Sequence, residues 1–109
     1  MDLVVTSYEV TKQFPQSEQY RLVSQIQRAA VSIPANIAEG HGREHLGDCL
    51  HHLSMANGSL MELETHFVLA GRLGFLKAEL MNQLLDQTAE VGRMLAGLIR
   101  SLKNSRPGS

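Results

Sequence analysis

A row of imidazole and hydroxyl groups recurs every seven residues in the middle of the chain, and such groups ligate metals and activate nucleophiles. The row consists of His45, His52, Ser59 and His66. If this segment is a helix, residues seven apart lie ~10 Å apart along its axis, so the three histidines cannot share one ion. The Glu-x-x-His spacing of di-iron bundles is also missing. We therefore expect no metal and no cofactor.

Acidic residues and a single cysteine near this row do not change that expectation. Asp48 and Glu62 each precede a histidine by four residues, a spacing at which two side chains can meet on a helix. Cys49 falls on an apolar stripe, where a lone cysteine usually packs as a small hydrophobic residue. Serine, histidine and aspartate are all present, but without a nucleophile elbow or a Gly-rich phosphate loop. The sequence therefore predicts no enzymatic activity.

A second group of polar residues precedes this row and shares one face of a helix. It consists of Ser32, Asn36, Glu39 and Arg43. Residues three or four apart on a helix are neighbours, so these side chains can contact one another. One interpretation is a site for a ligand or a protein partner. The other is a hydrogen-bonded network that fixes the register between helices or subunits.

The last helical segment ends in basic residues and contains no acid between residues 93 and 106. The basic residues are Arg93, Arg100, Lys103 and Arg106. Cations are favourable at a helix C-terminus, where they complement the helix dipole. Alternatively, the same residues form a patch that binds the phosphates of RNA or DNA, and an oligomer would repeat that patch.

These residues must be positioned by helices, because helix formers dominate and strand-like alternation is absent. Loop signals occur at FPQS, EGHGRE and GRLGFLK, and they divide one domain, residues 1–109, into four segments. Ser17 is a plausible cap for the second helix, and Gly74 is placed to end the third. The expected helices span about 2–13, 17–40, 43–72 and 77–103, and residues 104–109 are expected to form a flexible tail.

Apolar residues follow a 3-4 spacing in each long segment, which is the pattern of a bundle core. Leu53, Leu60 and Phe67 are examples from the third segment. Because the connections are short, neighbouring helices should be antiparallel. The predicted fold class is therefore all-α, an antiparallel up-down four-helix bundle.

Pro34 lies in the middle of the second expected helix. A proline there removes an amide, clashes with the carbonyl of Ala30 and costs ~3 kcal/mol. The apolar stripe nevertheless continues in register from Ile26 through Ile33 to Ile37. We therefore expect helix two to be continuous and kinked at Pro34. The alternative is two helices that meet near Ser32.

Three helices carry more apolar residues than one core face needs. In helices two and three the surplus residues lie off the core stripe, where a monomer should meet water. Such faces suggest an interface between subunits, although scattered exposed apolar residues are common. The residues expected at this interface are Val31, Ala35, Ala38, Met55 and Leu69.

Composition excludes some classes of protein. The chain of 109 residues has a net charge of -1, which is unlike a protein that coats nucleic acid through bulk charge. One cysteine permits no disulfide within the chain. The first residues lack the pattern of a signal peptide, and no apolar run is long enough to span a membrane. We expect a cytoplasmic protein with no membrane partner.

Two stretches of the sequence resemble a known family. FPQSEQYRLVSQIQRAAVSIPANIAEGHGRE and GSLMELETHFVLAGRLGFL are similar to four-helix-bundle proteins encoded in intervening sequences of bacterial 23S rRNA genes. Accessory proteins of diversity-generating retroelements are related to that family. The resemblance covers about residues 8–103. This chain departs from the family in its low net charge and in a shorter first helix without tryptophan.

The resemblance implies an up-down four-helix bundle, with the proline inside helix two, that assembles into a ring-shaped homopentamer. For the retroelement members it also implies binding to nucleic acid and to a reverse transcriptase. We therefore expect a non-enzymatic scaffold, or an adaptor for nucleic acid or ribonucleoprotein. The alternative is a protein-binding module without a nucleic-acid role, whose partner contacts Asn36, Glu39 and Arg43.

Overall fold

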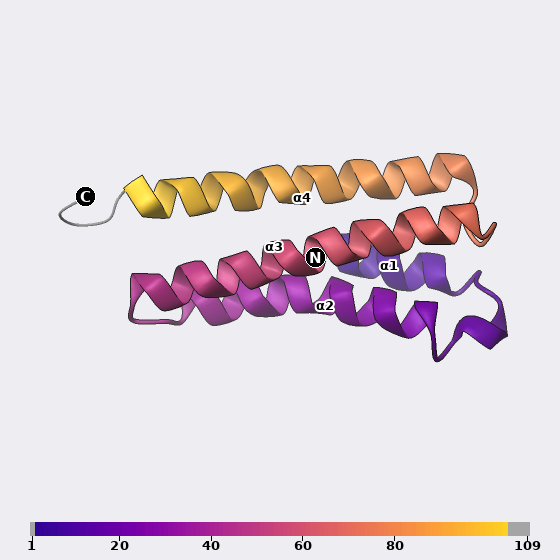
Figure 1. The fold of residues 1–109 in the computed structure, drawn as a ribbon, viewed down its shortest axis with the longest axis horizontal. Coiled ribbons are helices and arrows are strands. Elements are labelled where there is room, and N and C mark those ends of the chain that lie inside the picture. Colours follow the sequence, from indigo (N-terminus) through magenta and orange to yellow (C-terminus); the bar gives the residue numbers. More distant parts are fainter. Residues whose placement is uncertain (1, 105–109) are drawn as a thin grey trace.

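The computed structural model describes residues 2–104, and all regular structure within them is helical. Four α-helices follow one another in opposite directions along the long axis of the molecule (Figure 1). A short 3-10 helix lies between the first two of them. The elements are α1 (Asp2–Thr11), η1 (Gln16–Glu18), α2 (Leu22–His41), α3 (Leu46–Arg72) and α4 (Ala78–Asn104).

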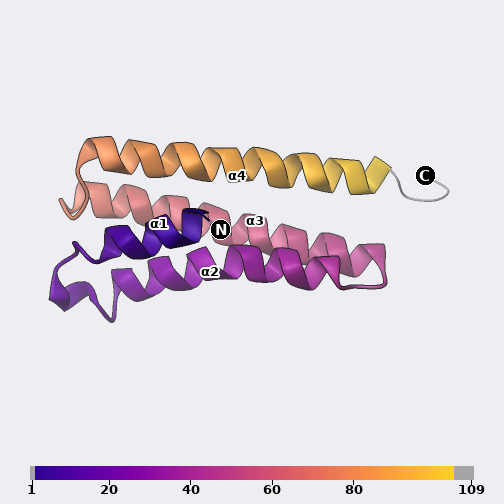
Figure 2. The ribbon, with the colours of Figure 1, turned by 180° about the vertical axis from the view of Figure 1, so that it is seen from behind.

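The helices form a bundle in which α1 is much shorter than its neighbours. The most extensive packing is between α2 and α3, and α3 also packs along α4. Helix α1 contacts α2 and α4, and Figure 2 shows it lying between them. Because α1 has 10 residues and α3 and α4 have 27 each, α1 covers only one half of the bundle.

The core consists of the apolar stripes that the 3-4 spacing predicts. Ile26, Leu60 and Phe67 are fully buried, and Ile33 is nearly so. Helix α3 contributes six buried residues, because it packs against both α2 and α4. Burying a large aliphatic or aromatic side chain contributes about 1.5–3 kcal/mol, so this stripe is the main source of stability.

The end of α3 matches the prediction made for Gly74. This residue has a φ of 81°, a conformation that glycine adopts without steric cost. The amide of Phe75 donates to the carbonyl of Ala70 at 2.9 Å, and the amide of Gly74 donates to the carbonyl of Gly71 at 3.2 Å. These two bonds form a Schellman motif, which ends the helix and turns the chain toward α4.

The start of α2 differs from the sequence-based expectation. Ser17 does not cap this helix, because it lies within the 3-10 turn and α2 begins five residues later, at Leu22. The residue before the helix is Arg21, which makes no capping hydrogen bond through its side chain. Pro15 precedes the turn, and the amide of Glu18 donates to its carbonyl at 2.9 Å. Residues 17–21, which were expected to begin helix two, therefore form turns with their own backbone hydrogen bonds.

Other helix limits shift by smaller amounts. Helix α1 ends at Thr11 rather than 13, α3 begins at Leu46 rather than 43, and α4 extends to Asn104. Asn104, which was predicted to begin the flexible tail, therefore belongs to α4. The rest of the predicted tail, residues 105–109, lies outside the described part of the chain.

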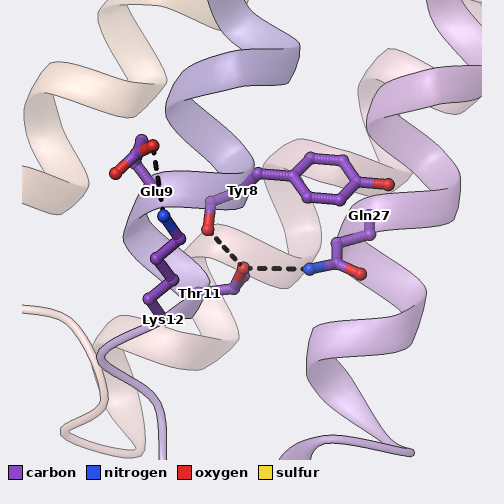
Figure 3. A network of polar contacts seen from close by, with 5 residues as sticks. All are labelled: Tyr8, Glu9, Thr11, Lys12 and Gln27. Atoms are coloured by element: carbon purple, nitrogen blue, oxygen red, sulfur yellow. Dashed lines mark hydrogen bonds and ion pairs between the residues drawn. The ribbon is translucent and has the colours of Figure 1, made fainter.

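The contact between α1 and α2 combines packing with one hydrogen bond between side chains. Gln27 of α2 donates to the hydroxyl oxygen of Thr11 at 3.3 Å, and the Thr11 hydroxyl donates to the carbonyl of Tyr8 at 3.0 Å (Figure 3). Lys12 pairs with Glu9 at 3.4 Å on the exposed side. Few polar contacts therefore secure this short helix, and apolar packing carries most of its attachment.

Helix α2 continues through Pro34, as the register of its isoleucines predicts. The helix extends twelve positions before this residue and seven after it, so an ending near Ser32 is wrong. Asn36, two residues after the proline, donates through its side chain to the carbonyl of Ser32 at 2.9 Å. The kink itself stays a prediction.

We predict that Pro34→Ala keeps the helix and straightens it locally. The substitution restores an amide for the Ala30 carbonyl and removes a clash of ~3 kcal/mol. Without the proline the unfolded chain also gains conformational freedom, and this lowers the free energy of unfolding by about 0.4–1 kcal/mol. The melting temperature should therefore be at or above that of the parent protein. Circular dichroism should show unchanged helix content, and a loss of helix would contradict this account.

Candidate functional site

The two polar rows that the sequence places on separate helices meet at the seam between α2 and α3. The hydroxyls of Ser32 and Ser59 share a hydrogen bond of 2.9 Å. Asn36 donates to the Ser32 hydroxyl at 3.0 Å, and its side-chain oxygen lies 3.1 Å from Nδ1 of His52. All four side chains are partly buried. The seam is therefore joined by a chain of hydrogen bonds between side chains.

This network has the geometry of a structural connection. An amide oxygen can only accept, so Nδ1 of His52 must carry the proton in its bond to Asn36. The Asn36 amide stands between this imidazole and the serine pair, and the two hydroxyls bond each other. No serine in the network is therefore bonded to a base that could accept its proton, as a nucleophilic mechanism requires.

The remaining two residues of the α2 stripe make a separate contact. Arg43 pairs with Glu39 at 3.0 Å, one turn apart on the exposed surface. An exposed pair of this spacing contributes about 0.3–0.5 kcal/mol. The expected stripe is thus divided into a partly buried pair, Ser32 and Asn36, that bonds to α3, and an exposed ion pair.

A shallow polar groove of about 470 Å³ continues the seam away from His52. Gln25 and Arg28 of α2 line it on one side, and Glu62 and His66 of α3 line it on the other. His66 therefore faces α2, as His52 and Ser59 do. The sequence signal for this pairing is the shared spacing of seven, since Gln25, Ser32 and Glu39 repeat at the same interval as the α3 row.

The apolar residues expected at a subunit interface are exposed on α2 and α3. Val31 is 42% exposed, and Met55 and Leu69 are each 44% exposed. Met55, Glu62 and Leu69 follow the α3 polar row by three positions each, so they form the adjacent row. Ala35 and Ala38 are exposed on α2. We call Val31, Ala35, Ala38, Met55 and Leu69, together with the polar seam, the α2–α3 face.

The basic residues of α4 are exposed and lie toward its C-terminal end. Arg93 and Arg100 are seven residues apart on one side of the helix, ~10 Å along its axis. Arg100 and Lys103 line a shallow groove of about 500 Å³ with Asn57 of α3. In the described part of the chain, no carboxylate pairs with Arg93, Arg100 or Lys103. Arg106, the fourth expected residue, lies outside the described residues.

Within residues 2–104, no group of three histidine, cysteine, aspartate or glutamate side chains is arranged to hold a metal ion. No described helix combines the length and apolar character needed to cross a membrane.

Comparisons with known proteins agree with this architecture. A crystal structure of a protein with unknown function from the S23 ribosomal protein family of Bacteroides thetaiotaomicron VPI-5482 superimposes with a TM-score of 0.77. The two sequences are 23% identical, and the match covers 88% of this chain and 87% of that one. No curated protein matches the chain. The family model of the 23S rRNA-intervening sequence protein matches residues 1–97. The chain therefore belongs to the 23S rRNA-intervening sequence protein family.

Proposed function

We propose that this protein is a non-enzymatic homo-oligomer, a pentameric ring by family resemblance, that acts as a scaffold or as an adaptor for nucleic acid or ribonucleoprotein. The observation that carries the proposal is the α2–α3 face. Val31, Met55 and Leu69 expose a large part of their side chains there, although each follows the helical spacing of its neighbours. Apolar residues that gather on one face favour contact with another protein surface.

The polar seam supports self-association in addition to the apolar residues. Interfaces combine an apolar centre with hydrogen-bonding groups that fix the relative orientation of the partners. Arg28 and Glu62 are exposed on opposite sides of the seam and have opposite charges. A second copy could place its own charges against them, and this would specify one arrangement of subunits.

Assembly would also multiply the basic end of α4. Within the described residues, one chain has three exposed basic side chains there, which is a small number for binding phosphates. A ring would repeat this group in every subunit, and several weak contacts on one nucleic acid raise the overall affinity. Because the net charge of the chain is -1, nucleic-acid binding should depend on the basic residues of α4 and should be weak in each subunit.

We predict that Val31→Glu dissociates the assembly. The substitution would place an unpaired carboxylate in an apolar contact, which is strongly unfavourable. Light scattering at micromolar concentration should give a multiple of the 12.0 kDa chain mass for the parent protein, about fivefold for a pentamer, and a smaller mass for the variant.

The matched control is Met61→Glu, which adds the same charge at an exposed methionine outside the α2–α3 face. This variant should keep the parent mass. A parent protein that is monomeric would refute the proposal, and dissociation by the control alone would place the interface on another face.

We also predict that any binding to RNA or DNA falls steeply with salt and depends on α4. Each phosphate that is neutralised releases counterions, so affinity decreases as a power of the salt concentration. Changing Arg93, Arg100 and Lys103 together to Gln should remove the binding and leave the assembled mass unchanged. Affinity for a ribosomal RNA fragment and for duplex DNA can be measured by gel shift at several salt concentrations.

The control for this experiment removes three positive charges from the other end of the bundle. Arg21, Arg72 and Lys77 are exposed there, and changing all three to Gln alters the net charge equally. Binding should survive this change. Equal loss of binding in both variants would mean that total charge matters more than the basic residues of α4. If the intact parent oligomer binds no nucleic acid, a role with protein partners only would be favoured.

A further inference from the structure

Two rows of exposed residues run along α2 and α3, one on each helix, at the spacing of three and four that defines one helix face. The row that we call the α2 ridge consists of Arg28, Val31, Ala35 and Ala38. The row that we call the α3 ridge consists of Met55, Gly58, Glu62, Thr65 and Leu69. Each ridge contains a single charged residue, and the two residues have opposite charges. The two ridges are therefore complementary in charge.

The two charges of these ridges are unpaired within the described chain. Arg28 and Glu62 are exposed and line opposite sides of one polar groove, yet neither forms an ion pair within residues 2–104. An exposed charge beside apolar side chains such as Val31 and Leu69 favours a partner that offers the opposite charge in an apolar setting. A second copy offers this to both helices, because its α3 ridge suits the α2 ridge and its α2 ridge suits the α3 ridge.

The packing of α2 against α3 fixes the height of each charge along the bundle. The hydroxyls of Ser32 and Ser59 bond each other at 2.9 Å, and the two helices run in opposite directions (Figures 1 and 2). Arg28 lies four residues before Ser32, and Glu62 lies three residues after Ser59, so both are displaced toward the same end of the bundle by similar amounts. Arg28 and Glu62 therefore lie at nearly the same height.

Equal height of the two charges restricts how copies can be related by symmetry. A rotation about an axis parallel to the helices moves a copy sideways and leaves every residue at its height. Such a rotation brings Glu62 of the next copy opposite Arg28 without any shift along the bundle. Turning the next copy end over end about a two-fold axis instead sets each ridge against its own counterpart, where no opposite charge is present. Charge therefore favours the rotation about an axis parallel to the helices.

The sizes of the side chains fit the same arrangement. At nearly equal height, Met55 lies opposite Ala35 of the next copy, and Val31 lies opposite Gly58 of the next copy. A Cβ atom built on Gly58 would have no atom of another element within 4 Å, so the space above this residue is open to a side chain from outside. Each large apolar side chain therefore meets a small residue, which allows two helices to pack closely.

We propose that the α2 ridge of one copy packs antiparallel on the α3 ridge of the next, with Arg28 paired to Glu62 of that copy and the axis of the assembly parallel to the helices. This inference rests on the self-association proposed above and specifies its interface. It applies to a ring of any number of subunits, in which every interface contains the same pair.

The test reverses the two charges separately, together and in different chains. The variants are Arg28→Glu, Glu62→Arg and the double variant that carries both changes. Sedimentation velocity over a range of concentrations gives the concentration at which half of each protein is dissociated. An equimolar mixture of the two single variants is measured in the same way, because recovery in the mixture requires a pair formed between chains.

Each single reversal should raise the half-dissociation concentration by about tenfold or more, since like charges would then face each other. The double variant should return to within about threefold of the parent protein, as expected for two residues that interact directly. The mixture should assemble at concentrations where neither single variant does so alone, because each variant supplies the charge that the other lacks.

The matched controls make the same charge changes outside both ridges. Lys77→Glu and Glu90→Arg alter exposed residues in the α3–α4 connection and on α4. Because neither residue lies near the proposed pair, each change should alter the half-dissociation concentration by less than about twofold. Circular dichroism shows whether every variant is folded.

Failure of this inference is distinguishable from failure of self-association. A monomeric parent protein would overturn self-association and this pairing with it. With an assembled parent, the pairing alone would be overturned if the folded single variants assemble as the parent does, or if the double variant is no better than the single ones. Recovery in the double variant without recovery in the mixture would mean that the two charges act within one chain, and this would also overturn the pairing.

Discussion

The packing of α2 against α3 is the constraint on which the rest of the structure depends. Gly40 shows how close the two helices are, since a Cβ atom built on it would lie 3.1 Å from the carbonyl oxygen of Cys49. The approach brings apolar stripes together on the inner side and the Ser32, Asn36, Ser59 and His52 network together on the outer side. Apolar burial supplies most of the stability, while the polar bonds fix the register. Both α1 and α4 then pack against this pair.

Much of the fold could be predicted because the core depends on a periodic pattern. The stripe through Ile26, Ile33 and Ile37 is strong enough to indicate a continuous helix despite Pro34, and Gly74 marks the end of α3 because few other residues tolerate its φ. The start of α2 could not be located in this way. Residues 16–18 form a turn that bonds to itself, and the choice between this turn and a longer helix depends on small local energies and on the path back from α1.

The sequence predicts which residues form the candidate surfaces, but not how those residues are arranged relative to one another. Val31, Met55 and Leu69 are exposed as their helical phase indicates, since phase is a local property. The bond between Ser32 and Ser59 joins residues 27 apart, and it depends on how far α3 is shifted along α2. A groove of about 630 Å³ where α2 ends, α3 begins and α4 ends was not predicted, because it depends on how the ends of three helices lie relative to one another.

The shortness of α1 also affects how the bundle opens. A helix of 10 residues is below the length at which isolated helices are stable in water, so α1 keeps its structure only while it stays docked. Its attachment to the other helices is less extensive than that between α2 and α3. Amide protons of α1 should therefore exchange with solvent through a local opening that leaves the other three helices closed. In that open state the apolar side chains of α2 and α4 that α1 covers would meet water, so part of the core can be exposed without unfolding the bundle.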